Sequence, residues 1–65
     1  MIVVGDETKS LNRFYAFDDA GNRVADGELR LMAMALYVVG REKVAKLVVH
    51  PRNQQYCADF LANDP

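Results

Sequence analysis

The chain contains a single histidine, His50, and a single cysteine, Cys57, two residue types that often act in acid–base and nucleophilic catalysis. His50 precedes Pro51 at the end of an apolar run, where functional groups often gather, and an imidazole titrates near neutral pH. No serine, cysteine or aspartate lies at a spacing that would identify a partner for this histidine. Cys57 lies beside Phe60 on an apolar stripe, which indicates an inert, buried thiol. We therefore expect no enzymatic activity from these residues.

A group of arginine and aromatic residues points to a different chemistry, the stacking of single-stranded nucleic acid. The members of this group flank a predicted hairpin and are Arg13, Tyr15, Phe17 and Arg23. Packing in a sheet core already explains most of the aromatic residues. The 8 Lys and Arg against 9 Asp and Glu give a net charge of −1, which provides no strong field to attract a polyanion. Nucleic-acid binding is therefore an alternative to the main hypothesis.

The elements that must position these side chains begin with strands. A β-branched run predicts a strand over Ile2–Val4, and the residues from 5 to 12 favour a loop. A hairpin is predicted from a strand over 13–17, through turn-forming residues at 18–22, into an extended segment at 23–25. In its first strand, Phe14 and Ala16 lie on one face and Tyr15 and Phe17 on the other, so neither face is clearly the solvated one.

A helix is predicted over 27–39, with an Asp26 cap, the charge of Glu28 in its first turn, and Gly40 at its end. Its segment from 29 to 39 has one charged residue, Arg30. On a helical wheel the apolar residues occupy two opposite faces. The first face contains Leu29, Met32, Ala33, Leu36, Val39 and Gly40, and the second contains Leu31, Met34, Ala35 and Val38.

Two apolar helix faces need two coverings, and a chain of 65 residues can cover one of them with its own strands. The second face therefore either lies beneath the chain's own last helix or contacts another chain. Closed two-fold assembly is the commonest oligomer, so a second copy of this protein is the simplest partner, with a different protein as the other possibility. The methionine in the middle of this face suits an adaptable contact.

The remaining sequence predicts a strand and a short helix. A β-branched run favours a strand over 44–49, although a helix that continues through Gly40 would also keep apolar residues four apart. Pro51 ends this segment in either case. An apolar stripe predicts a helix over 53–62, capped by Asn53 and packed on the core. The stripe consists of Tyr56, Cys57, Phe60 and Leu61.

These elements predict one α/β (α+β) domain over 1–65, with the order β-β-β-α-β-α and helices packed on a small mixed sheet of three to four strands. The apolar run at 29–39 is well short of the roughly 20 residues that a membrane-spanning helix needs. The opening residues show no secretory signal, and a lone cysteine fits a reducing compartment. We therefore expect a cytoplasmic protein with no membrane partner.

That element order, together with a few residues, resembles the amino-terminal half of the ribonuclease H-like fold, and the resemblance spans most of the chain. The family has an acidic residue after its first strand, matched by Asp6 after IVVG, and a glutamate early in its first helix, matched by Glu28 in GELRLMAMAL. A third acid follows the family's fourth strand, where Asn53 follows KLVVHPR here. The resemblance implies a Mg²⁺-dependent nuclease, but two carboxylates and an amide would hold Mg²⁺ poorly.

Partial versions of this fold occur in HicB-type antitoxins, where the fold serves binding. The sequence therefore predicts a small, non-enzymatic protein–protein interaction module without a cofactor, most simply a homodimer, of the kind found among phage or mobile-element accessory proteins. The expected contact residues are Leu31, Met34, Ala35 and Val38. The alternatives are a reduced nuclease that uses Mg²⁺ at Asp6, Glu28 and Asn53, and a nucleic-acid-binding protein.

Overall fold

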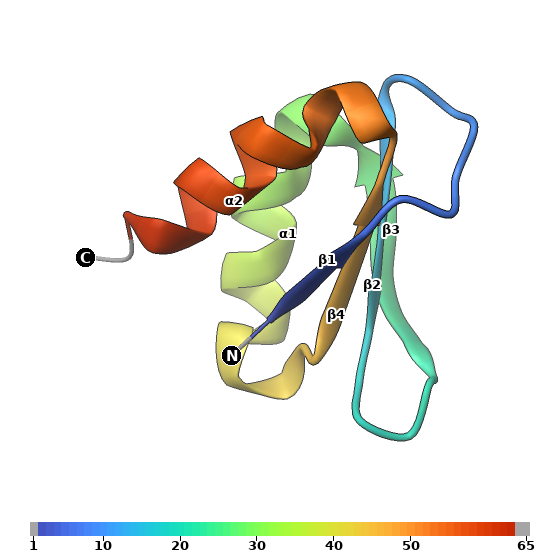
Figure 1. Cartoon of the computed structure of the whole chain (residues 1–65). Helices are drawn as coiled ribbons and strands as arrows, with labels where there is room; N and C mark the ends of the chain where they lie inside the picture. The colour runs from blue at the N-terminus through green and yellow to red at the C-terminus, as the bar shows by residue number, and fades with distance from the viewer. Residues whose placement is uncertain (1, 64–65) are drawn as a thin grey trace.

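The computed structural model describes residues 2–63, which form a four-stranded mixed sheet with two helices on one of its faces (Figure 1). The strands are β1 (Val3–Gly5), β2 (Arg13–Phe17), β3 (Arg23–Glu28) and β4 (Lys46–Val49), and the helices are α1 (Met32–Val39) and α2 (Gln54–Ala62). The sheet order is β1-β4-β2-β3, with β1 parallel to β4 and the other neighbours antiparallel. This confirms the predicted class and element order. Residues 1, 64 and 65 of the predicted domain lie outside the described residues.

The hairpin of β2 and β3 forms because alternating side chains separate two faces. Phe14 and Ala16 are fully buried beneath the helices, while Tyr15 and Phe17 are half-buried on the opposite face. The turn is held by the carboxylate of Asp18, which accepts hydrogen bonds from the backbone N–H groups of residues 20 and 22 at 3.0 and 2.8 Å. An aspartate that binds its own following backbone is typical of a tight turn. The predicted hairpin is therefore confirmed.

The predicted start of the first helix is wrong. Residues 23–28 belong to β3, where Glu28 pairs with Arg13 and Gly27 pairs with Phe14. Asp26 caps no helix and instead contacts Arg13 and Arg23 at 3.9 and 3.3 Å. A 3₁₀ turn over Leu29–Leu31 then leads into α1. The pairing of β3 with β2, which places Gly27 opposite the fully buried ring of Phe14, prevails here over the preference of Asp26 to cap a helix.

The first helix ends where the sequence predicts. Gly40 has φ 96°, a backbone conformation that side chains rarely adopt, and its N–H donates to the carbonyl of Leu36 at 2.9 Å. The alternative of a helix that continues through Gly40 is therefore wrong, and a strand follows. This strand, β4, lies between β1 and β2, with Leu47 and Val49 fully buried on the helix-covered face.

The second helix, predicted over 53–62, begins one residue later, and its predicted side-chain cap is wrong. A 3₁₀ turn over Pro51–Asn53 precedes it, and the side chain of Asn53 caps no helix. The Nδ2 of Asn53 donates instead to the carbonyl of Leu11 at 2.6 Å, and the Nδ1 of His50 accepts from the N–H of Arg52 at 3.1 Å. Asn53 therefore ties the long loop before β2 to the start of α2.

The two helices share one core with the sheet. α1 packs over β3 and α2 over β1, and the Sγ of Cys57 lies 3.9 Å from the Sδ of Met32 where the helices meet. Of the predicted stripe on α2, Cys57 is buried and Phe60 and Leu61 are partly buried, but Tyr56 is exposed. The buried core consists of Phe14, Ala16, Met32, Leu36, Val44, Leu47, Val49 and Cys57.

The burial of Cys57 predicts slow thiol chemistry. Its side chain is 0% exposed, and burial raises the pKa of the thiol, so little thiolate is available. We expect a thiol-labelling reagent to modify Cys57 only when the protein unfolds. The labelling rate should therefore rise with urea concentration until it equals the labelling rate of an unfolded cysteine peptide. Rapid, complete labelling without urea would contradict this placement.

Candidate functional site

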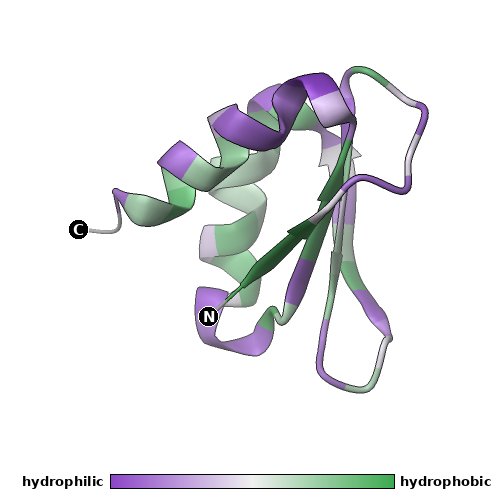
Figure 2. Ribbon diagram, in the orientation of Figure 1, coloured by the Kyte–Doolittle hydropathy of each residue, from purple (hydrophilic) through white to green (hydrophobic). Residues whose placement is uncertain are grey.

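The solvent side of α1 carries a set of large apolar side chains that nothing in residues 2–63 covers. The exposed fractions are 47% for Leu31, 69% for Met34, 86% for Tyr37 and 76% for Val38. We call these four residues the α1 outer face. Figure 2 shows α1 in green and pale shades along its length, whereas α2 carries purple, hydrophilic segments. An exposed apolar surface on an otherwise amphipathic fold is the property that needs an explanation.

Three of the four predicted contact residues lie on the α1 outer face. The fourth, Ala35, is partly buried and packs against the core, so the structure does not place it with the others. Tyr37 was missed because it falls between the two predicted faces. Its position three residues after Met34 could have indicated it, since side chains three apart are neighbours on a helix surface.

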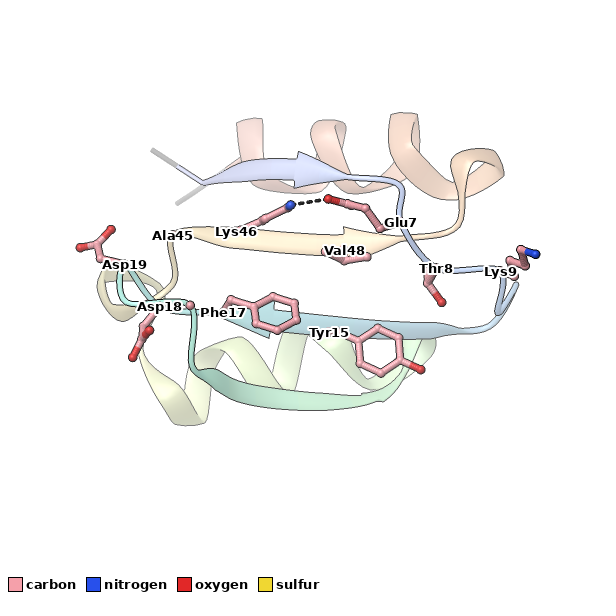
Figure 3. A pocket seen from close by; sticks show the side chains of 11 residues that line it. Glu7, Thr8, Lys9, Tyr15, Phe17, Asp18, Asp19, Ala45, Lys46 and Val48 are labelled. Carbon is pink, nitrogen blue, oxygen red and sulfur yellow. Dashed lines mark hydrogen bonds and ion pairs between the residues drawn. The ribbon is translucent and has the colours of Figure 1, made fainter.

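The face of the sheet opposite the helices is a second exposed surface. Its floor is formed by alternate residues of the two central strands, Tyr15 and Phe17 on β2 and Lys46 and Val48 on β4. We call this surface the open face. Figure 3 shows both aromatic rings on the side of the sheet away from the helices. The loop after β1 and the β2–β3 turn border a shallow, open hollow of about 740 Å³.

An ion pair between distant parts of the chain crosses this surface. The Nζ of Lys46 donates to the carboxylate of Glu7, which the loop after β1 brings over the strands (Figure 3). Gly5 leaves the space for this contact, because a Cβ there would lie 2.8 Å from the Cε of Lys46 and would collide with the carboxylate. A larger residue at this position would therefore displace the Glu7 and Lys46 side chains from their present contact.

This ion pair predicts a specific response to acid. The hydrogen bond from Lys46 holds the pKa of Glu7 below its ordinary value of 4.5. A lowered pKa in the folded state contributes stability above the ordinary value, and that contribution is lost as the pH falls through the folded-state pKa. Below pH 4.5, we expect the urea midpoint of the wild type to decrease with falling pH more steeply than the urea midpoint of Glu7→Gln.

The matched control for this prediction is Lys46→Gln, which removes the same interaction from the other side and should flatten the same part of the curve. If the wild type and both variants lose stability in parallel as the pH falls, the ion pair makes no contribution.

The predicted nucleic-acid residues are brought together on the open face. Arg13, Tyr15 and Phe17 alternate along β2, and the guanidinium carbon of Arg23 lies 5.8 Å from the centre of the Tyr15 ring. Both arginines, however, contact the carboxylate of Asp26. The cations of this surface are therefore largely matched by carboxylates, which leaves little net positive potential for a phosphate backbone.

The predicted metal ligands are not brought together. Asp6 follows β1 and Glu28 ends β3, and these strands form opposite edges of the sheet. Three inter-strand spacings separate the two edges by about 14 Å. The amide of Asn53 donates to a loop carbonyl. Within residues 2–63, no group of three or more His, Cys, Asp and Glu side chains has an arrangement that could hold a metal ion.

Comparison with known proteins gives no relative. No protein-family model, curated protein or solved structure matches this chain. The described helices include none that is both long and apolar enough to cross a bilayer. The candidate functional sites are therefore two surfaces of the fold, the α1 outer face and the open face.

Proposed function

We propose that this protein is a non-enzymatic interaction module that associates with a second copy of itself through the α1 outer face. The observation that carries this proposal is the row Leu31, Met34 and Val38, at spacings of three and four, with Tyr37 beside it, all exposed on one side of α1. Such spacing places the side chains in one stripe, the pattern by which helices pack against partner helices.

A second copy suits this face because the face is self-complementary. Met34 lies near the middle of the stripe, both along α1 and around it, so a two-fold axis beside Met34 would set Leu31 of one copy against Val38 of the other. Each end of the stripe is flanked by both a positive and a negative side chain. Before α1, Arg30 contacts Glu28 at 2.8 Å, and after α1 come Glu42 and Lys43. An antiparallel pair would therefore bring mixed charges together at each end.

The size of the face indicates a modest affinity. Its four side chains expose an apolar area on the order of a few hundred Å², the range in which a patch on a monomer marks an interaction site. A stable interface buries about 800 Å² on each partner, so α1 alone supports an association at the weak end of the range. The dimer should consequently dissociate on dilution.

The direct test combines solution mass with cross-linking. Light scattering over a hundredfold dilution should show a mass that falls from twice the 7.3 kDa chain toward one chain. Met34→Cys should form a disulfide-linked dimer under mild oxidation, because helices packed with axes about 8–10 Å apart bring facing Cα atoms within disulfide range.

The matched control is Gln55→Cys, an exposed position on α2. It should cross-link much more slowly, and the native Cys57 is buried and should not compete. A monomeric mass at every concentration, or equal cross-linking at positions 34 and 55, would contradict self-association through α1. The ribonuclease H-like resemblance and its Mg²⁺ chemistry stay predictions, and no step of this proposal depends on them.

A further inference from the structure

The hollow on the open face has the dimensions of a ligand site. Its volume of about 740 Å³ lies within the range typical of small-molecule pockets. The floor is largely apolar apart from Lys46, since Val48 is only 6% exposed beside the aromatic side chains and Ala45 continues the floor toward the turn. The rim is polar, with the loop after β1 on one side and the β2–β3 turn on the other. Concave shape, an apolar floor and a few polar rim groups are the usual properties of a binding site.

The aromatic floor favours a particular kind of ligand. The rings of Tyr15 and Phe17 stand two residues apart on β2 and line the hollow (Figure 3). The face of an aromatic ring carries a partial negative charge and attracts an organic cation within about 6 Å of its centre. The guanidinium of Arg23 already lies 5.8 Å from the centre of the Tyr15 ring. The cross-strand neighbours of Phe17 are Arg23 and Lys46, and each of these cations is paired with a carboxylate, Asp26 and Glu7 respectively. The Phe17 end of the hollow is therefore the end at which a ligand cation would gain most.

The charges of the rim agree with this preference. Three carboxylates and two ammonium groups line the hollow, namely Glu7, Asp18 and Asp19 against Lys9 and Lys46. Lys46 is matched by Glu7. The remaining charges are separated, with Lys9 at one end of the hollow and the turn that carries both aspartates at the other (Figure 3). The hydrogen bond from the N–H of Asn22 holds the pKa of the Asp18 carboxyl below its ordinary value.

We infer that the open face binds an organic cation, a guanidinium or ammonium group on an apolar carrier, with the cation over Phe17 beside Asp18 and Asp19 and the apolar part over Tyr15 and Val48. Nothing in this inference depends on the dimer proposed above, because α1 packs on the opposite side of the sheet and both surfaces are available at once. A single-stranded polyanion is the disfavoured occupant, since the lining has one carboxylate more than it has ammonium groups.

The experiment is a titration followed by the backbone amide signals of the isotope-labelled full chain. Benzylguanidinium is the cationic probe, and phenylacetate, which has a similar carrier and the opposite charge, is its matched anion. We expect the cation to shift the signals of Tyr15, Phe17 and Val48 along a saturable curve, and the anion to leave them in place. An equal response to both probes, a stronger response to phenylacetate, or no response to either would overturn the inference.

Charge variants locate the cation. Asp19→Asn should weaken benzylguanidinium binding about three- to fivefold, as expected for the loss of one exposed charge contact. Asp59→Asn is the control, since it removes the same charge from α2, where Asp59 accepts from Gln55 and does not line the hollow. If the two substitutions change the dissociation constant equally, the cation does not lie at the turn and the inference is wrong.

Two further titrations distinguish the source of the cation and test the competing macromolecule. A five-residue capped peptide with arginine between two leucines, compared with the same peptide carrying glutamate, tests a side chain of a protein partner. Tighter binding of the arginine peptide than of benzylguanidinium identifies a peptide as the source, and tighter binding of the small probe identifies a free organic cation. An eight-nucleotide oligothymidine that shifts the same signals more strongly than either cation would overturn the inference in favour of nucleic acid.

Discussion

Replacement of Met34 by glutamate is expected to convert the proposed dimer into a monomer at every accessible concentration. Met34 lies nearest the proposed two-fold axis, so the substitution would bury two carboxylates opposite each other without a partner for either. We expect the dimer dissociation constant to rise about 100-fold, which corresponds to about 2.7 kcal/mol, a moderate value for an uncompensated buried charge. Light scattering across a dilution series measures this effect.

The fold of the Met34→Glu monomer should be unaffected, because the side chain is 69% exposed and contributes little to the core. Far-ultraviolet circular dichroism and the urea midpoint at high dilution check this expectation. The matched control is Tyr56→Glu on α2, where an exposed apolar residue outside the α1 outer face is replaced by the same charge. A Met34→Glu protein that keeps the wild-type mass, or a control that dissociates equally, would remove the basis for a dimer through α1.

Replacement of Phe14 by alanine is expected to unfold most of the protein at room temperature. Phe14 is 0% exposed in the middle of β2 and belongs to the cluster that joins the sheet to both helices. Truncation of a buried phenylalanine costs about 3–5 kcal/mol. A single core in a chain of this size rarely supplies more than about 3–5 kcal/mol in total, so the loss is comparable with the whole stability. Urea unfolding followed by circular dichroism measures it.

Phe17→Ala provides an internal comparison, because the same residue type lies three positions further along the same strand, on the open face. Its ring is only half-buried, and its truncation should lower the free energy of unfolding by about 1 kcal/mol, within the range for a partly exposed apolar side chain. Equal losses for the two substitutions would mean that the open face is covered in solution to the same extent as the core.

The elements of this fold could be predicted because local signals agree with tertiary packing in most places. The alternation of Phe14 and Ala16 with Tyr15 and Phe17 separates the two faces of β2, and Gly40 ends α1 through its own backbone conformation. Helical periodicity also indicated the buried side of α1, since Met32 and Leu36 are in the core, although Ala33 of the same predicted face is exposed. Prediction failed where a long-range partner competes with a local preference, as at Asp26, which is held in β3 by pairing with β2.

The candidate sites were predictable to different degrees for the same reason. The row Leu31, Met34 and Val38 follows from helix periodicity alone, which is a property of neighbouring residues. The hollow on the open face depends on Glu7 reaching Lys46 across 39 positions of sequence, and no periodic pattern encodes that contact. The separation of Asp6 from Glu28 likewise depends on the strand order, which could not be predicted from local sequence patterns.

The place of β4 in the sheet has a consequence for how the chain folds during synthesis. β4 lies between β1 and β2 although it is the last strand to be translated, so β1 has no strand to pair with until residues 46–49 have left the ribosome. Before that point the nascent chain can form only the local hairpin of β2 and β3, with α1 beside it. At about 5–20 residues per second, the ribosome needs a few seconds to add residues 29–49, which carry α1 and β4. The central strand then enters between two segments already made, so the four-stranded sheet forms only after β4 has emerged.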